Sequence, residues 1–252
     1  MAFIQAIINP AALGFATRID VIIPLDPRQP DREPATKILY LLHGLGGNSS
    51  DWVRKSRIEE YANNHNYIVI MPEVQRSMYA NMKYGSAYLT YVTKELPQIV
   101  ERLFNIKHTR EHTYIAGLSM GGYGALKAGL NRPEFYAAAA GFSGVLDLPS
   151  HKGSHDAMGI VGQMKAIFGE DLYYPDEDNL FVLADKVHLL HEKPRLLITC
   201  GTEDALLADN HKFIKHLENL SIPYEYKEWT GEHTWQFWEE SLPIMFAFFS
   251  KE

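Results

Sequence analysis

Two kinds of apolar pattern alternate along most of the chain. Short β-branched or aromatic runs, typical of strands, lie at 3–8, 15–23, 37–42, 67–71, 113–117, 135–142, 195–200 and 224–229. Apolar residues at helical spacing lie between them, at 56–64, 85–104, 121–130, 206–220 and 234–249. Pro97 should kink or divide the longest of these helical segments. This alternation predicts an α/β fold with a mostly parallel central sheet and helices on both faces.

The interval 143–194 interrupts the alternation. It has helical patterns at 157–168 and 179–190 but no clear strand. We interpret it as an insertion between two strands, lying over the edge of the sheet where active sites form in such folds. The chain is therefore predicted to be a single domain, 1–252, with a small cap insertion at about 143–194 that shapes a substrate pocket.

A serine flanked by glycines lies where a predicted strand meets a predicted helix. The residues are Gly117, Leu118, Ser119, Met120 and Gly121. In the α/β-hydrolase fold a nucleophilic serine occupies such a turn, which is so tight that side chains two residues to either side would collide. Glycine at both positions removes the collision and tolerates a strained backbone. We therefore predict that Ser119 is a nucleophile; the alternative is an ordinary glycine-rich turn.

A serine hydroxyl becomes a nucleophile when a base takes its proton, and the base must be held by an acid. In this fold the chain order is serine, acid, histidine. The loop after the strand at 195–200 contains Glu203 and Asp204, and we favour Asp204 because it can return to the sheet edge. His233, in a glycine-containing loop before the last helix, is the predicted base. Asp209 falls inside the next helix and is expected to face water or to cap that helix.

An acyl oxyanion needs two N–H donors. Met120 is expected to supply one, because it follows the serine at a helix N-terminus, where N–H groups lack partners. The second is expected from the glycine-rich loop after the strand at 37–42, and we assign it to Leu45. His43, in the same loop, is expected to bond nearby backbone.

Three further residues are candidates for contact with substrate: Gly46, Trp52 and Trp235. Trp235 and Trp238 are three apart on a predicted helix, so at least one of them is expected to pack in the core. Cys200 follows a buried strand and is expected to be inert.

Composition narrows the range of partners. The 252 residues carry a formal net charge of −7, which argues against nucleic acid and disfavours an anionic membrane surface. The single cysteine excludes a disulfide within the chain. The first residues alternate and break at a proline, and no apolar run approaches the span of a bilayer, so we expect a cytoplasmic protein without membrane insertion.

Metal binding is not expected. His151 and His155, with Asp156 beside the second, have a spacing that ligands can have, but no third ligand or matching motif accompanies them. We therefore expect neither a metal nor a cofactor.

Four motifs in order along the chain carry a family resemblance. They are 41–48 (LLHGLGGN), 117–125 (GLSMGGYGA), 201–204 (GTED) and 232–235 (EHTW). On these motifs, and over nearly its whole length, the chain resembles the esterase D-like branch of the α/β hydrolases, and within it the bacterial tributyrin esterases. The resemblance implies a serine carboxylesterase that hydrolyses short-chain acyl esters, such as tributyrin or aryl acetates and butyrates, without a cofactor.

The resemblance also implies roles for individual residues. It assigns the nucleophile to Ser119, the acid to Asp204, the base to His233 and the oxyanion donors to Leu45 and Met120. S-formylglutathione hydrolases of the same branch usually have histidine before the nucleophile, where this chain has Leu118. That departure counts against such a thioesterase without excluding it.

Other functions remain open on the sequence. A carbohydrate deacetylase would use the same three residues and differ in its pocket. A non-catalytic binding protein typically lacks one of the three, and none is missing here. The expected partner is a small-molecule acyl ester, and a homo-oligomer is left open.

Overall fold

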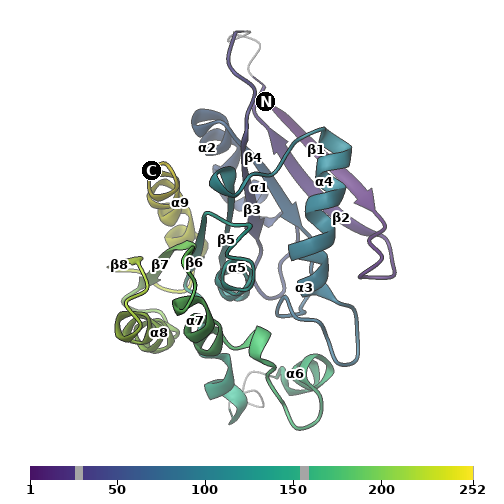
Figure 1. Ribbon diagram of the computed structural model, residues 1–252. Coiled ribbons are helices and arrows are strands. Elements are labelled where there is room, and N and C mark those ends of the chain that lie inside the picture. The colour runs from purple at the N-terminus through teal and green to yellow at the C-terminus, as the bar shows by residue number, and fades with distance from the viewer. Residues whose placement is uncertain (26–30, 154–158, 252) are drawn as a thin grey trace.

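A single twisted sheet forms the centre of the molecule (Figure 1). The computed structural model describes residues 1–25, 31–153 and 159–251. Its strands are β1 (Ala2–Ile8), β2 (Thr17–Ile23), β3 (Lys37–Leu42), β4 (Tyr67–Pro72), β5 (Thr113–Leu118), β6 (Ala138–Phe142), β7 (Arg195–Gly201) and β8 (Tyr224–Trp229). They lie in the order β1-β2-β4-β3-β5-β6-β7-β8. Only the β1–β2 and β2–β4 pairings are antiparallel, so the predicted mostly parallel sheet is confirmed.

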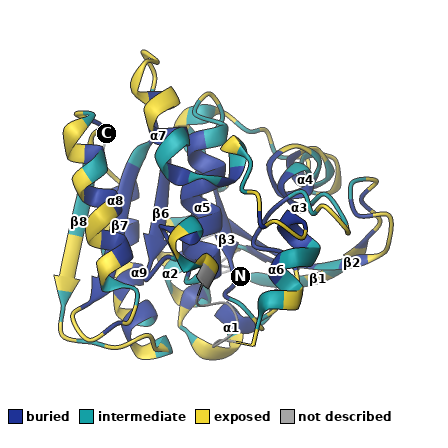
Figure 2. Cartoon of the chain, turned by 90° about the horizontal axis from the view of Figure 1, so that it is seen from below, coloured by how far each residue is buried: buried dark blue, intermediate teal, exposed yellow. Residues whose placement is uncertain are grey.

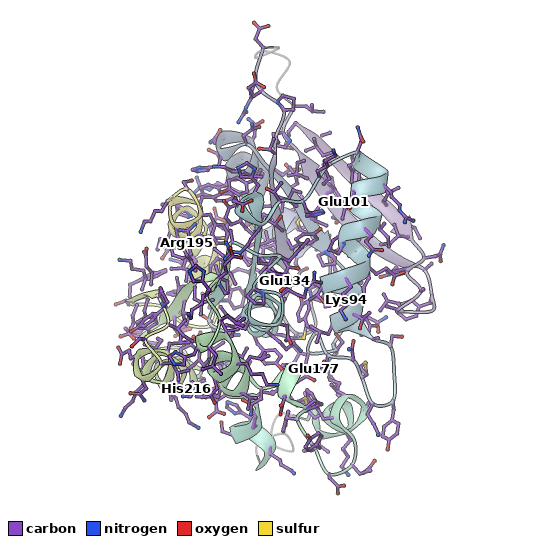
Figure 3. All side chains as sticks on the ribbon, viewed as in Figure 1. Lys94, Glu101, Glu134, Glu177, Arg195 and His216 are labelled. Atoms are coloured by element: carbon purple, nitrogen blue, oxygen red, sulfur yellow. The ribbon has the colours of Figure 1, made fainter. Side chains whose placement is uncertain are left out.

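Helices cover both faces of the sheet. They are α1 (Asp51–Lys55), α2 (Ile58–His65), α3 (Tyr88–Thr90), α4 (Leu96–Phe104), α5 (Met120–Asn131), α6 (Val161–Phe168), α7 (Leu180–His188), α8 (Leu207–Asn219) and α9 (Trp235–Phe249). The helices α1, α2 and α9 share one apolar core, and α4 to α8 share the other. Lys94 and His216 lie on opposite flanks of the molecule (Figure 3). In the described ranges, no helix combines the length and the apolar character needed to span a bilayer.

The central strands are buried on both sides, which explains their nearly continuous apolar sequences. In β3, Leu39 and Leu41 join the core under α9, whereas Tyr40 and Leu42 join the core under α5. All four are fully buried (Figure 2). Burying one such side chain contributes about 1.5–3 kcal/mol, so the sheet centre is a rigid support for the loops at its edges.

The helical segment expected at 85–104 consists of three consecutive helical stretches, two α-helical and one π-helical. A π-helical stretch, η1 (Tyr91–Glu95), separates α3 from α4. Pro97 lies in the first turn of α4 and has no N–H to offer the carbonyl group of Thr93. That carbonyl group instead accepts a hydrogen bond from Arg132 at 2.7 Å. The boundary predicted from Pro97 is therefore confirmed.

Other elements differ from the prediction at their ends. The strand expected from residue 15 begins at Thr17, and the strand expected from residue 135 begins at Ala138. Turns at 11–14 and 133–135 precede these two strands. The short helix α1 was not expected, since so few residues cannot show a helical period.

The interval 143–194 connects β6 to β7. Its described residues form η3 (Leu148–Gly153), α6, η4 (Asp176–Asp178) and α7, and no strand. The helix α7 packs against α5 and α8 on the face of the sheet. The residues before it reach the carboxyl edge of the parallel strands, where Val145, Leu148 and Met164 line a cavity.

Candidate active site

Ser119 occupies a strained turn between β5 and α5. Its backbone angles are φ 54° and ψ −118°, which a residue with a side chain rarely adopts. A Cβ placed on Gly117 would lie 2.4 Å from the carbonyl oxygen of Gly121. A Cβ on Gly121 would lie 2.5 Å from the carbonyl oxygen of Leu42. Close packing therefore requires both flanking glycines, as predicted for a nucleophile turn.

Three side chains from three loops form one hydrogen-bonded chain. The Nε2 atom of His233 lies 2.9 Å from Ser119 Oγ, and its Nδ1 atom lies 2.9 Å from Asp204 Oδ2. Ser119, Asp204 and His233 follow β5, β7 and β8, whose carboxyl ends meet at one edge because the strands are parallel. With Nδ1–H donating to the carboxylate, Nε2 is left as the acceptor for the serine hydroxyl. The structure thus brings together the predicted nucleophile, acid and base.

The carboxylate of Asp204 is held in its charged form. Its side chain is buried, whereas that of His233 is 34% exposed. Burial works to raise the pKa of Asp204, but hydrogen bonds from His233 and from the N–H of Leu206 outweigh it. The pKa of Asp204 therefore lies below its ordinary value of 3.8. A charged carboxylate can orient the imidazole and stabilise it when it becomes positive.

Glu203, the alternative acid, holds the loop that carries the histidine. Its Oε2 atom accepts a hydrogen bond from the N–H of Gly231 at 2.5 Å. Its Oε1 atom accepts one from the hydroxyl of Thr202 at 2.8 Å. Glu203 is therefore a support for the position of His233, a role that its place in the sequence did not indicate.

Asp209 does not face water or cap its helix, so the expectation for it is wrong. Its side chain is 11% exposed and lies 2.6 Å from Nε2 of His151, which belongs to η3. The pair connects α8 to the segment over the active site. His155 and Asp156, considered with His151 for metal binding, lie outside the described residues.

The predicted oxyanion donors both border the serine. Leu45 and Met120 line the same cavity as Ser119. In the part of the chain that the structure describes, neither N–H donates to a protein acceptor. A Cβ placed on Gly44 would lie 2.6 Å from Leu118 Cδ1, so the glycine allows this loop to approach the serine turn closely. Two unpaired N–H groups beside the serine hydroxyl suit a tetrahedral oxyanion.

Two buried side chains, His43 and Tyr79, hold the loop that carries Leu45 by hydrogen bonds. The Nδ1–H of His43 donates to the carbonyl oxygen of Gly44 at 2.8 Å, and its Nε2 accepts from the N–H of Val74 at 3.1 Å. The hydroxyl of Tyr79 donates to the carbonyl oxygen of His43 at 2.8 Å. The structural role predicted for His43 is therefore confirmed.

An apolar cavity of about 390 Å³ opens on Ser119 and His233. Its apolar side chains are Leu45, Met78, Met120, Val145, Leu148, Ile160, Met164, Ala205 and Leu206. Most of these were missed in the sequence, because an apolar residue in a loop has no distinguishing spacing. Val145 was missed too, but its position gives a signal. It lies just after the end of β6, and binding sites in such folds form at the carboxyl ends of the strands.

A smaller cleft of about 200 Å³ also reaches Ser119 and His233. Gly46 and Trp235, both predicted to contact substrate, lie in its wall. Its other side chains are Leu45, Asp51, Lys55, Leu118 and Trp238. The two charged residues among them were missed, since they lie on the unexpected helix α1.

The prediction that Trp52 contacts substrate is wrong. Its side chain is fully buried, and its indole N–H donates to the carbonyl oxygen of Leu42 at 3.0 Å. Its ring packs edge-on against Trp235, with ring centroids 5.2 Å apart. The sequence could not show which of the two tryptophans would lie nearer the cleft.

A buried ion pair ties the nucleophile helix to the segment before α7. The Nζ atom of Lys127 lies 2.6 Å from Asp178 Oδ1, and both side chains are buried. The same ammonium group donates to the carbonyl oxygen of Met78 at 2.9 Å. The hydroxyl of Tyr123 donates to the carbonyl oxygen of Asp178 at 2.6 Å. These bonds hold together three segments, two of which carry a cavity residue, Met78 and Met120.

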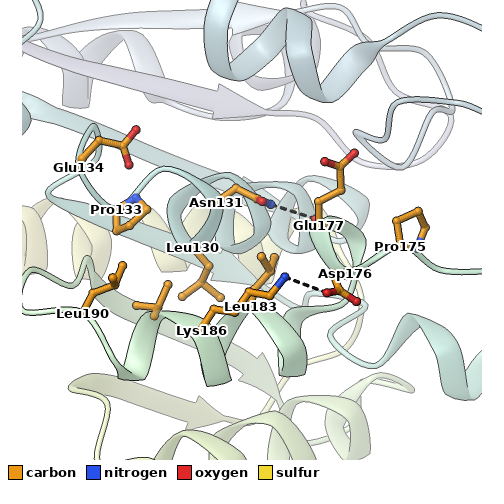
Figure 4. Close-up of a pocket in the computed structure, with 11 residues that line it drawn as sticks. Leu130, Asn131, Pro133, Glu134, Pro175, Asp176, Glu177, Leu183, Lys186 and Leu190 are labelled. Carbon is orange, nitrogen blue, oxygen red and sulfur yellow. Dashed lines mark hydrogen bonds and ion pairs between the residues drawn. The ribbon is translucent and has the colours of Figure 1, made fainter.

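A larger groove, of about 660 Å³, lies at the opposite end of α5 from Ser119 (Figure 4). Lys186 is paired with Asp176 at 2.8 Å, and Asn131 donates to the carbonyl oxygen of Glu177 at 2.9 Å. Among the described residues that line it, none is a serine, a cysteine or a histidine. The size of this groove therefore does not make it the site of the chemistry.

Neither a thiol nucleophile nor a metal site is found among the described residues. Burial, with a smaller effect from the charge of Asp204, raises the pKa of Cys200 to about 12, so its thiol is not a nucleophile at neutral pH. Among the described residues, no group of three His, Cys, Asp or Glu side chains is arranged to hold a metal ion.

Comparisons with known proteins agree with this geometry. The model of the Esterase family ("Putative esterase") matches residues 13–249. The chain is 31% identical to an acetyl esterase of Caldicellulosiruptor saccharolyticus, over 100% of this chain and 99% of the relative. It is similar to FphF, a fluorophosphonate-binding serine hydrolase of Staphylococcus aureus, with a TM-score of 0.88 and 31% identity over 100% and 99% of the two chains. It is also similar to the S-formylglutathione hydrolase FrmB of that organism, with a TM-score of 0.82 and 31% identity over 99% of both.

The fold and these similarities define the class of protein as an α/β hydrolase with serine hydrolase chemistry. The chain belongs to the Esterase family and is a serine esterase.

Proposed function

We propose that the protein is a carboxylesterase that hydrolyses short-chain acyl esters, of the tributyrin or aryl acetate and butyrate type. The observation that carries the proposal is the hydrogen-bonded chain from Ser119 through His233 to Asp204, placed at the mouth of an apolar cavity. The relative named acetyl esterase supports the same kind of substrate.

The first step acylates the serine. His233 Nε2 accepts the proton of the Ser119 hydroxyl while Oγ attacks the ester carbonyl carbon. Asp204 keeps the imidazole in the required tautomer and stabilises the imidazolium that forms. The N–H groups of Leu45 and Met120 donate to the oxyanion, and removal of one such donor typically costs about 10²–10³ in kcat.

The imidazolium of His233 then gives its proton to the leaving alcohol, the C–O bond to that alcohol breaks, and the acyl-enzyme remains. In the second step, which releases the acid, water gives a proton to His233 Nε2 and attacks the acyl carbon. The imidazolium returns that proton to Ser119 Oγ as the bond between Oγ and the acyl carbon breaks. We assign the acyl chain to the apolar cavity, whose walls include Val145, Leu148, Ile160 and Met164. These residues then act as the small cap expected from the sequence.

A thioesterase is the second candidate. It is favoured by the 31% identity to an S-formylglutathione hydrolase, and it would use the same three residues. Kinetic constants for S-formylglutathione and p-nitrophenyl butyrate, measured side by side, distinguish the two functions.

The nucleophile is tested by replacement and by labelling. Ser119→Ala should lower kcat for p-nitrophenyl butyrate by about 10⁴-fold or more, because a base without a nucleophile retains little catalysis. A fluorophosphonate should label the wild-type protein at Ser119, as read by mass spectrometry of its peptides. Ser250→Ala, an exposed serine on the far end of α9, is the control and should retain activity and label. Label on another serine would contradict the assignment.

The acyl preference is tested with a series of p-nitrophenyl esters from acetate to decanoate. We expect kcat/KM to be highest for acetate or butyrate and to fall for the long chains. A maximum at decanoate would contradict the short-chain substrate while leaving the esterase class intact.

A further inference from the structure

The smaller cleft differs in chemistry from the apolar cavity with which it shares Ser119 and His233. One wall consists of Asp51 and Lys55 on α1, and another contains the ring of Trp235. The Nζ atom of Lys55 lies 3.1 Å from Asp51 Oδ2 and 5.0 Å from the centre of the Trp235 ring. Two cavities of opposite polarity therefore meet at the nucleophile.

We propose that this cleft binds the alcohol part of the ester, and that it selects an uncharged alcohol with several hydroxyl groups. The inference rests on the proposed esterase function, because it divides the substrate of that reaction between the two cavities.

The position of the cleft supports the alcohol assignment. An ester bound with its carbonyl carbon at Ser119 Oγ directs its acyl and alcohol parts away from each other. The nonpolar part is stabilised in the cavity whose lining is mostly apolar, as with any apolar ligand. The alcohol oxygen then faces His233, which must protonate it, and the remainder of the alcohol enters the cleft beside Lys55.

The pairing of the two charges favours hydroxyl groups over an ion. A substrate carboxylate would compete with Asp51 for Lys55, and a substrate cation would compete with Lys55 for Asp51. A hydroxyl group donates and accepts at once, so neighbouring hydroxyls can bond the carboxylate and the ammonium without separating them.

The loop opposite the ion pair is built to leave room for this alcohol. A Cβ placed on Gly47 would lie 2.5 Å from Asp51 Oδ2, so only glycine allows the carboxylate to approach the loop. Gly46 has a φ of 76°, a conformation that side chains disfavour, and a Cβ there would meet open space. This part of the loop therefore has no side chains, so no bulky group covers Asp51 and Lys55 in the cleft.

The test compares two butyrate esters that differ in the alcohol. Glycerol monobutyrate has two free hydroxyl groups and butyl butyrate has none, and butyrate release gives kcat/KM for each. We expect the wild-type protein to prefer the glycerol ester about tenfold, since its hydroxyl groups can bond Asp51 and Lys55, whereas a butyl chain covers the remaining hydrogen-bonding positions of this pair without bonding them. In Lys55→Met and in Asp51→Asn, that preference should fall about tenfold.

Methionine keeps the contact with Trp235 while removing the charge, and asparagine keeps the shape of the aspartate. The control is Lys186→Met, which breaks a more exposed ion pair, between Lys186 of α7 and Asp176 of η4, away from the cleft. It should leave the preference unchanged. Thermal melting identifies a variant that folds poorly, and Lys55→Gln then replaces Lys55→Met, with the same expected loss of preference.

Several outcomes would overturn the inference. One is a wild-type ratio of kcat/KM for the glycerol ester to kcat/KM for the butyl ester that is near one. Others are a ratio that neither variant changes, and an equal loss of kcat/KM on both esters. Another is a loss confined to a thioester with a carboxylate-bearing thiol, which would make the cleft an anion site. If the wild-type protein hydrolyses neither ester and no aryl butyrate, the proposed esterase function itself fails.

Discussion

The electrostatics of single residues explain how Ser119 is activated. The carboxylate of Asp204 is buried, yet it stays charged because His233 and a backbone N–H bond it. The position of this acid was predicted from the loop after β7. Its hydrogen bond to Leu206 was not, because only the folded loop shows which N–H groups point back toward the carboxylate.

This carboxylate should make the stability of the protein depend on pH. Its pKa is lower in the folded chain than its ordinary value of 3.8, so it stabilises the fold above that value and loses this effect as pH falls. Asp204→Asn should therefore lower the melting temperature at about pH 7 and pH 5 alike, and the gap to wild type should close below about pH 4. Melting curves across this range check the result, and a gap that widens in acid would contradict it.

A second prediction for a single residue concerns the turn at Ser119. Gly121→Ala places a methyl group 2.5 Å from the carbonyl oxygen of Leu42, which is backbone and cannot turn aside. We expect destabilisation of about 1–3 kcal/mol and a fall in kcat, because the turn must shift to relieve the contact. Urea unfolding and kcat for an aryl butyrate measure the two effects. Gly162→Ala, at a helical glycine where a Cβ would meet open space, is the matched control and should leave kcat unchanged without destabilising the protein.

At the scale of elements, the pairing of α5 with the segment before α7 depends on a buried charge. Burial lowers the pKa of Lys127, and the nearby Asp178 opposes that shift. No pattern in the sequence marks this lysine, which lies in an apolar helix and would be expected at the surface. Met78, whose carbonyl group accepts a hydrogen bond from this lysine, belongs to the wall of the apolar cavity.

Removal of one member of this pair should cost more than removal of both. Lys127→Met leaves the carboxylate of Asp178 buried and unpaired, which typically costs about 3–5 kcal/mol. The double variant Lys127→Met with Asp178→Leu should recover a large part of that loss, because no buried charge remains. Urea unfolding of the two variants and of each single change checks the coupling. Strictly additive losses would show that the pair is not a unit.

At the scale of the whole molecule, the parallel sheet gathers residues that are far apart in the chain. Ser119 and His233 are 114 residues apart, yet their side chains lie within hydrogen-bond distance because β5 and β8 end at the same edge. The central strands β3 to β7 are buried on both faces, so the loops at this edge rest on a rigid support (Figure 2).

The chemistry of this edge should need no metal. Acyl transfer by a serine, a histidine and an aspartate supplies the nucleophile, the base and the oxyanion donors from the chain itself. Dialysis against EDTA should leave both kcat/KM for an aryl butyrate and the melting temperature unchanged. A loss of activity that a divalent ion restores would contradict this expectation.

The sequence by itself determined the alternation of strands and helices, the turn at Ser119, and the loops that carry Asp204 and His233. These are local features, since each depends on a short run of residues and on the rule that parallel strands share an edge. The tertiary structure alone decided that Trp52 is buried behind Trp235, that α1 brings Lys55 to the cleft, and that Met164 lines the apolar cavity. The physical reason is that a periodic pattern shows which residues are buried. It does not show which residues of distant segments they contact, because those contacts depend on tertiary packing.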